Sequence, residues 1–143
     1  MKKLLLVLPL MIVGFTLSAQ SAISVKFNED IPGICDKNRI YVMLSFDGQE
    51  KAVCPVTNDS ILKRLNSDVT FLKEHSAHQD KGMLTLIINC NGKVVRCNLD
   101  GNIQNPELDK QIFAVVNSLG SWKAGKLLGK EVDTVIIYNF EIK

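Results

Sequence analysis

The sequence has few of the residues that usually build enzyme and metal sites. Its 143 residues include two histidines and one tryptophan, and its four cysteines form no Cys-x-x-Cys pair. The lack of that pair disfavours a thioredoxin-like or zinc-knuckle site, and no Gly-x-Ser-x-Gly, His-Glu-x-x-His or complete phosphate-binding loop occurs. His75, His78 and Asp80 form one metal-like cluster, but they lie in a polar stretch where histidines are usually solvated. We therefore expect no catalysis, no cofactor and no bound metal.

The chain also lacks an apolar run long enough to span a membrane. Lys2 and Lys3 precede an apolar run at residues 4–17, and small residues follow before Gln20. This order is typical of a secretory signal peptide, and the run falls short of the ~20 residues of a spanning helix. We therefore expect residues 1–19 to be a signal peptide. The mature protein should be periplasmic or secreted, with no stable membrane span.

An excess of basic charge is absent as well. The chain has 17 basic and 15 acidic residues, and two of the lysines belong to the predicted signal peptide, so the mature protein carries almost no net charge. Phosphate contacts supply most of the affinity of nucleic-acid-binding proteins, and these contacts need a basic surface. A nucleic-acid partner is therefore not expected.

The N-terminal region of the mature chain, residues 20–56, predicts a strand and a hairpin. Residues 23–27 alternate apolar and polar side chains, as a half-buried strand does. Residues 30–37 contain Pro-Gly and predict a loop. Asp47-Gly48 then lies between two alternating segments, 39–46 and 49–54, and predicts a two-residue hairpin turn.

Residues 57–143 predict a helix followed by a hairpin, a second helix and a strand. Thr57-Asn58-Asp59 can cap a helix that continues to Leu72, and the polar residues 76–82 predict a loop. Asn91-Gly92 is a strong signal for a two-residue hairpin turn. Asn105-Pro106 predicts the start of the second helix. Its apolar stripe comprises Leu108, Ile112, Val115, Val116 and Leu119.

A long alternating strand at residues 132–142 ends the chain, after a connection rich in Gly and Lys. These elements predict an α+β fold. An antiparallel sheet of the hairpin–helix–strand type would carry the helices on one face, with the N-terminal strand and hairpin as an addition.

The four cysteines suggest one candidate disulfide. In the two-residue turn Cys90 faces Lys93, which leaves Cys97 ~13 Å away along the strand. A disulfide requires Cα atoms within ~7 Å, so Cys90 and Cys97 should not be bonded to each other and are expected to be small core residues. Cys35 and Cys54 flank the first hairpin, and export would permit a bridge between them.

Several segments of the second half resemble the C-terminal domain of TonB. Gly82-Met-Leu-Thr-Leu-Ile-Ile-Asn-Cys-Asn-Gly-Lys-Val94 is similar to the first hairpin of that family, and Asn105-Pro-Glu-Leu-Asp-Lys-Gln-Ile112 to the opening of its helix. Trp122-Lys-Ala-Gly-Lys126 and Gly129-Lys-Glu-Val132 resemble its connection into the last strand, and Tyr138-Asn-Phe140 resembles the end of that strand. The family usually has proline where this chain has alanine after Trp-Lys.

The resemblance implies a binding function. In TonB-like domains a partner peptide adds as a strand to the last strand of the sheet, and the family's membrane anchor and Pro-rich spacer have no counterpart here, since the chain has four prolines. The implied partner is a protein or peptide segment, such as part of an outer-membrane receptor, with a link to outer-membrane transport. The implied partner-binding residues are Asp133, Val135, Ile137, Asn139 and Glu141.

The alternative is a structural envelope protein with no peptide ligand. In that case the edge of the sheet would be covered by residues 20–56 or by a second copy in a homodimer, because exposed strand edges are normally protected. The two hypotheses differ in one observable feature, which is whether the last strand is open or covered in the folded chain.

Overall fold

The computed structural model describes residues 22–74, 80–100 and 105–142. The predicted signal peptide, His75 and His78 lie outside these ranges. Within them no helix is long and apolar enough to cross a bilayer. Strands in two sheets and helices packed against the larger sheet confirm the predicted α+β class.

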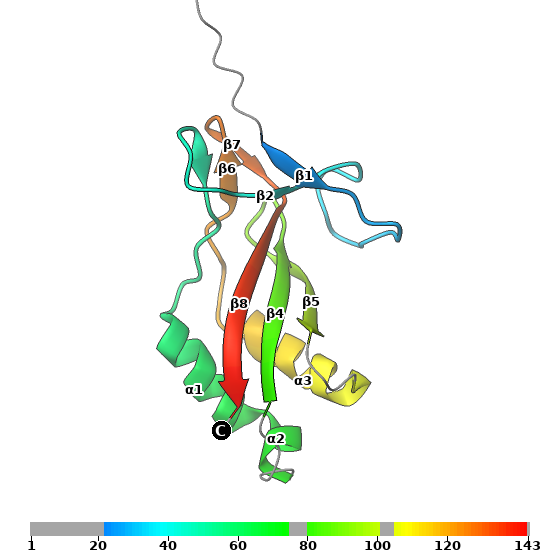
Figure 1. Cartoon of the computed structure of the whole chain (residues 1–143), viewed down its shortest axis with the longest axis vertical. Coiled ribbons are helices and arrows are strands. Elements are labelled where there is room, and N and C mark those ends of the chain that lie inside the picture. Colours follow the sequence, from blue (N-terminus) through cyan, green and yellow to red (C-terminus); the bar gives the residue numbers. More distant parts are fainter. Residues whose placement is uncertain (1–21, 75–79, 101–104, 143) are drawn as a thin grey trace, which may run out of the picture.

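The larger sheet has five strands in the order β1-β2-β8-β4-β5 (Figure 1). The long strands β8 (Thr134–Ile142) and β4 (Asp80–Ile88) are antiparallel, and β5 (Val94–Asp100) returns beside β4. β1 (Ile23–Val25) and β2 (Ile40–Val42) form a short antiparallel pair. β2 joins β8 in parallel, so the N-terminal region extends the sheet.

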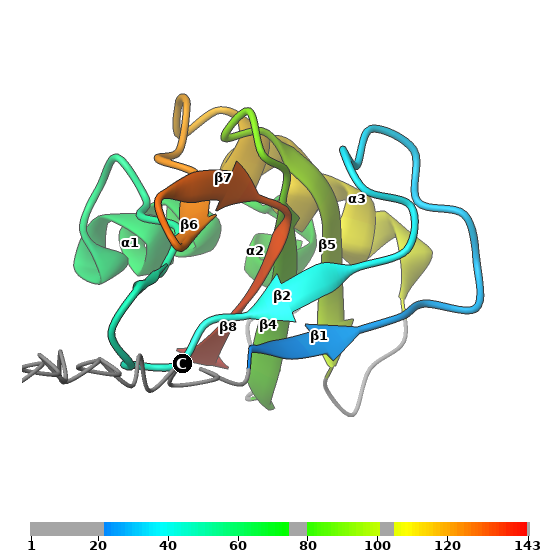
Figure 2. The ribbon, with the colours of Figure 1, turned by 90° about the horizontal axis from the view of Figure 1, so that it is seen from above.

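Helices cover one face of this sheet (Figure 2). α1 (Asn58–Asp68) begins after Thr57, whose hydroxyl accepts a hydrogen bond from the N–H of Ser60. α2 (Thr70–Glu74) follows a break at Val69, which is extended and fully buried. The single helix predicted for this region is therefore interrupted, because burial of Val69 in the core outweighs continuation of the helix.

α3 (Pro106–Asn117) begins where the sequence predicts. The side chain of Asn105 accepts hydrogen bonds from the N–H groups of Glu107 and Leu108, and Pro106 occupies the first turn. The predicted apolar stripe is buried in the main core, which confirms the face of the helix. Its members are Leu108, Ile112, Val115, Val116 and Leu119.

The β4–β5 hairpin has the predicted pairing over most of its length but a different turn. Leu84 faces Leu99 and Leu86 faces Cys97, as a two-residue turn would require. The register then shifts between Ile87 and Ile88, so that Ile88 pairs with Val94. The turn accordingly has three residues, 90–92, and Gly92 supplies the positive φ of 73°.

The register shift is a β-bulge, and it determines on which face of the sheet each residue of β5 packs. Val94 and Cys97 pack with the helices in the main core, whereas Val95 packs on the opposite face. That face carries a second, smaller apolar cluster under the N-terminal loop. Its members are Phe27, Ile31, Ile34, Ile40, Ile87, Val95 and Val135.

A smaller sheet has the order β3-β6-β7. β3 (Gln49–Glu50) pairs with β6 (Gly125–Leu127), which forms a hairpin with β7 (Lys130–Val132). Leu128 and Gly129 both have positive φ, 51° and 78°, as a two-residue type I′ turn requires. The segment predicted as a Gly- and Lys-rich connection is therefore a hairpin, and β7 leads directly into β8.

The hairpin predicted across Asp47-Gly48 is wrong in its pairing. The chain does turn there, since the N–H of Gln49 donates to the carbonyl of Phe46. The flanking strands, however, belong to different sheets, because β2 pairs with β1 and β8 whereas β3 pairs with β6.

The loop predicted for residues 76–82 is wrong at its C-terminal end, because β4 begins at Asp80 and pairs there with β8.

Candidate functional site

Strand β8 has one fully paired edge and one largely open edge. Toward β4 it is paired from Thr134 to Ile142. On the other side it pairs only with β2, at Thr134 and Val135. In the part of the chain that the structure describes, no other strand joins this side of β8, so the edge is open from Ile137 onward.

The direction of the free backbone groups follows from one hydrogen bond. The N–H of Tyr41 donates to the carbonyl of Asp133 at 2.9 Å, which places that carbonyl on the β2 side. Backbone groups of successive residues in a strand point to alternate sides, and the register between β8 and β4 is regular. The N–H groups of Ile137 and Asn139 therefore point to the open side.

A groove with a volume of about 840 Å³ lies along this open edge. One wall is β8, from Thr134 to Asn139, and the end nearest β2 is formed by residues 42–44. The opposite wall is the segment that leads from β3 to α1, which runs in the same direction as β8 in Figure 1. The residues of this wall are Lys51, Ala52, Val53, Cys54, Val56 and Asn58.

The segment that forms the opposite wall is paired with Lys123 through Val53. The N–H of Val53 donates to the carbonyl of Lys123 at 3.0 Å, and the N–H of Lys123 donates to the carbonyl of Val53 at 2.9 Å. Because peptide bonds are planar and trans, the carbonyl of Ala52 and the N–H of Cys54 must point away from Lys123. Neither group has a hydrogen-bond partner among the described residues.

Apolar side chains line both walls. Ile136, Tyr138 and Cys54 are half-buried and pack against the main core, and the ring of Tyr138 meets that of Trp122 edge to face, with centroids 6.2 Å apart. Val53 is 53% exposed and Ile137 56% exposed. These two exposed apolar side chains lie on facing walls of the groove.

Two titratable groups that line the groove, Cys54 and Tyr138, have raised pKa values. Cys54 is a free thiol, and burial raises its pKa above the ordinary value, so the thiolate needed for nucleophilic attack is scarce at neutral pH. Burial raises the pKa of the Tyr138 hydroxyl to about 12. Neither group is matched to proton transfer near neutral pH.

The structure divides the predicted partner-binding residues into four groups, of which the buried Asp133 is the last. Ile137 and Asn139 lie on the open edge of β8. Val135 lies where β2 is paired and contributes to the second apolar cluster. Glu141 belongs to β8, but its side chain lies outside the described residues.

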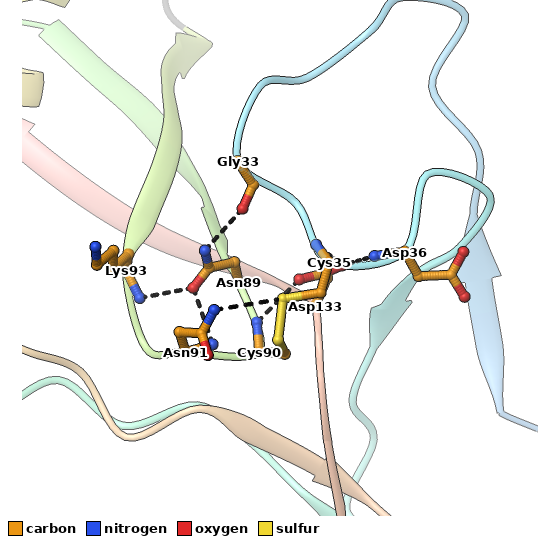
Figure 3. Close-up of a disulfide and its surroundings, with 8 residues drawn as sticks. All are labelled: Gly33, Cys35, Asp36, Asn89, Cys90, Asn91, Lys93 and Asp133. Atoms are coloured by element: carbon orange, nitrogen blue, oxygen red, sulfur yellow. Dashed lines mark hydrogen bonds between the residues drawn. A yellow bond between two sulfur atoms is a disulfide. The ribbon is translucent and has the colours of Figure 1, made fainter.

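Asp133 is buried, and its side chain is taken up by internal contacts. It is 1% exposed, and its carboxylate accepts hydrogen bonds from three backbone N–H groups, those of Cys35 (2.8 Å), Asp36 (2.7 Å) and Cys90 (2.9 Å). Figure 3 shows this carboxylate between the N-terminal loop and the β4–β5 turn. The prediction that Asp133 contacts a partner is therefore replaced by a structural role.

The predicted Cys35–Cys54 disulfide is also replaced by another pairing. Cys35 is bonded to Cys90, with Cα atoms 6.1 Å apart, whereas Cys54 and Cys97 are free. The predicted pairing relied on the first hairpin, which does not form. The absence of a Cys90–Cys97 bond agrees with the prediction, because the body of the β4–β5 hairpin keeps the predicted register.

The three-residue turn explains why Cys90 is available to the N-terminal loop. The side-chain oxygen of Asn89 accepts hydrogen bonds from the N–H groups of Asn91 and Lys93, and its amide donates to the carbonyl of Gly33 (Figure 3). Asn89 is 4% exposed, so these bonds fix both the turn and the loop above it. Cys90 follows directly and points toward Cys35.

The sulfur atoms of Cys35 and Cys90 and the carboxylate of Asp133 lie within 4.8 Å of one another. This proximity does not make a metal site here, because the sulfurs are bonded to each other and the carboxylate oxygens already accept three hydrogen bonds.

Comparison with known proteins gives no match: neither a protein-family model nor a curated protein or solved structure matches this chain. The likeness to TonB rests on the sequence motifs alone.

Proposed function

We propose that this protein binds an extended segment of another protein by strand addition at the open edge of β8. One observation carries the proposal: β8 is open from Ile137 onward, and a groove with apolar walls follows that edge. Such edges are normally protected by charge, proline or a covering segment. In the described residues none of these protects Ile137.

The likeness of the β8 region to the last strand of TonB domains supports the same mode of binding. Expected export would place the protein in the periplasm or outside the cell, where segments of envelope proteins are available as partners. Affinity would come mainly from main-chain hydrogen bonds, each worth roughly 0.5–1.5 kcal/mol net. The apolar walls of the groove would add specificity.

The alternative, a structural protein with a self-covered edge, has partial support. β2 does cover the beginning of β8, but only at Thr134 and Val135. A self-covered edge would need a partner strand along the rest of β8, and the described chain supplies none. The open remainder of the edge therefore disfavours cover by the N-terminal strands and leaves the edge available to another chain.

The decisive experiment uses peptides selected for binding to the mature protein from a library of displayed, unstructured decapeptides. Ile137→Pro removes the N–H that faces the groove and leaves pairing with β4 intact, because that N–H points away from β4. We expect this variant to lose at least about tenfold in affinity for the selected peptides, or about 1.4 kcal/mol. The matched variant Ile137→Thr keeps the N–H and should change the affinity only slightly.

Near-ultraviolet circular dichroism of Trp122, which is buried, provides the control for folding of both variants. Equal binding of the selected peptides by wild type and by folded Ile137→Pro would refute strand addition at β8. It would shift support to the structural alternative.

A further inference from the structure

The N-terminal strands lie outside the main core of the protein. β1 and β2 are found at one end of the molecule and the helices toward the other (Figure 1). Among the described residues, none before Ala52 belongs to the apolar cluster between the helices and the sheet. The main core is therefore complete without residues 22–42, and release of this region would leave that core intact.

The non-covalent contacts that hold residues 22–42 are limited in extent. β2 pairs with β8 only at Thr134 and Val135. Arg96 lies over the ring of Phe27 and forms an ion pair with Glu29, which is largely exposed, so the ion pair contributes little. The small second cluster joins the two parts through Phe27, Ile31, Ile34 and Ile40 on one side and Ile87, Val95 and Val135 on the other.

The remaining attachment is the junction around the Cys35–Cys90 disulfide. Two of the three N–H groups that donate to the carboxylate of Asp133 belong to the bonded cysteines themselves. The bond between Asn89 and Gly33 joins residues next to these cysteines (Figure 3). The disulfide links positions 55 apart in the sequence and so keeps both sides of the junction close together. Opening it would weaken all of these contacts at once.

The disulfide can be reached in the folded protein. Cys35 is exposed and Cys90 is half-buried. Both line a pocket with a volume of about 670 Å³ on the surface beside β7. Exposed disulfides are opened by thiol exchange more readily than buried ones. A dithiol from outside the protein can therefore attack this bond without unfolding of the main core.

Release of β2 would lengthen the open edge of β8. The carbonyl of Asp133 now accepts a hydrogen bond from the N–H of Tyr41. Backbone groups two residues apart in a strand point to the same side, so the N–H of Val135 lies on the β2 side together with those of Ile137 and Asn139. Without β2, the carbonyl of Asp133 and the N–H of Val135 would both be free to bind an added strand.

We propose that the Cys35–Cys90 bond is a redox site that sets the length of this edge. In the oxidised protein β2 covers the start of β8, and the edge is open from Ile137. When a dithiol opens the bond, residues 22–42 are released and the open edge begins at Asp133. The effect on the edge rests on the proposed function and adds regulation to the same site, whereas the release of β2 does not depend on it.

The reaction is a thiol–disulfide exchange. One thiolate of the dithiol attacks a sulfur of the Cys35–Cys90 bond, forms a mixed disulfide with it and displaces the other cysteine as a thiolate. The second thiolate of the dithiol then attacks its own mixed sulfur and displaces the remaining cysteine. The dithiol loses two electrons and two protons and becomes a disulfide, and Cys35 and Cys90 become thiols.

The first test treats the oxidised mature protein with dithiothreitol in the absence of denaturant. Alkylation and peptide mapping should show that Cys35 and Cys90 have become thiols. Hydrogen exchange is then measured by NMR at the amide of Tyr41, which reports on the β2–β8 contact, and at the amide of Val116, which reports on the main core. We expect exchange at Tyr41 to accelerate at least about tenfold more than exchange at Val116.

The double variant Cys35→Ala with Cys90→Ala is the matched control for the reagent. Its Tyr41 amide should exchange as fast as that of the reduced wild type and should not respond to dithiothreitol. Protection of Val116 in the same spectra shows that the main core of the variant is folded. Cys54 and Cys97 are free in both proteins, so they cannot account for the difference.

The second test measures peptide binding to the open form. Displayed, unstructured decapeptides are selected on the double variant, and their affinities are compared with those for the oxidised wild type. We expect the wild type to bind them at least about fivefold more weakly, because β2 occupies two of their main-chain partners. Ile137→Pro in the double variant should weaken binding as well, since it removes an N–H from the same edge.

The outcomes separate this proposal from the proposed function. A bond that dithiothreitol opens only when the protein unfolds would overturn the redox site, and equal acceleration at Tyr41 and Val116 would overturn the release of β2. Equal peptide affinities of the two forms would overturn control of the edge but leave strand addition standing if Ile137→Pro still weakens binding. Unchanged binding by folded Ile137→Pro would overturn strand addition together with control of the edge.

Discussion

The carboxylate of Asp133 accepts a hydrogen bond from the backbone N–H of Cys90 at 2.9 Å, although 43 positions separate the two residues in the sequence. The same carboxylate binds the N–H groups of Cys35 and Asp36, and Cys35 is bonded to Cys90. The N-terminal loop, the β4–β5 turn and the start of β8 therefore meet at one point (Figure 3). This junction holds β2 on the first two residues of β8 and leaves the rest of the edge open.

Asp133→Asn should destabilise the protein by about 2–4 kcal/mol. The amide nitrogen of Asn would face N–H donors, so at least one buried donor would lose its acceptor. Urea unfolding with the disulfide intact measures the change in unfolding free energy. Asp47→Asn is the matched control, because Asp47 is exposed and should tolerate the change within about 0.5 kcal/mol. Equal effects of the two substitutions would contradict the role given to Asp133.

Peptide mapping of the oxidised protein should yield a fragment that links Cys35 to Cys90. Removing both cysteines with Cys35→Ala and Cys90→Ala should lower the unfolding free energy by about 2–5 kcal/mol, because the bridge closes a long segment of the chain, with a sequence separation of 55. Cys54→Ala should leave the link in place. A fragment joining Cys35 to Cys54 would show that the N-terminal loop is placed differently.

Gly92→Ala should destabilise the protein by at least about 2 kcal/mol more than Gly129→Ala. Both glycines have positive φ, 73° and 78°, so the backbone strain is similar in the two variants. A Cβ at Gly92 would lie 2.0 Å from the carbonyl oxygen of Trp122, whereas a Cβ at Gly129 would meet nothing within 4 Å. Thermal unfolding compares the two variants directly, and equal melting temperatures would contradict the close approach of the turn to Trp122.

Stability should fall as the pH rises above about 9. Burial raises the pKa of the Cys97 thiol to about 12 in the folded state, from a reference value of 9.0. A raised folded-state pKa means that the folded state holds this proton more tightly than the unfolded state. The stabilisation is therefore complete below pH 9 and is lost progressively between pH 9 and 12.

Urea unfolding at pH 8, 9.5 and 11 measures this loss, and Cys97→Ala is the control. The variant should lose less stability over the same range, because Tyr138, whose pKa is also raised to about 12, would still contribute. An identical pH dependence in wild type and Cys97→Ala would exclude Cys97 as a source of the effect.

The sequence by itself determined the elements whose signals are local. The cap at Asn105 and the spacing of Leu108, Ile112 and Val116 define α3, since helix starts and apolar stripes depend on neighbouring residues. The alternation that sets apart Ile137 and Asn139 is also local, because successive residues of a strand point to opposite sides. The sequence could therefore show that Ile137 and Asn139 share one side of the strand, whereas which edge of β8 is open depends on its neighbours.

Only the tertiary structure decided which segments pair across long distances. No local pattern shows whether β2 pairs with Gln49–Glu50 or with β8. Alternation determines which face of the sheet each side chain occupies, but it does not determine which strands lie next to that strand. The partner of Cys35 and the burial of Asp133 follow from that choice, as does the wall formed by residues 51–54. The shift at Ile87 and Ile88, a single extra residue in one strand, is likewise not apparent from the periodicity of the sequence.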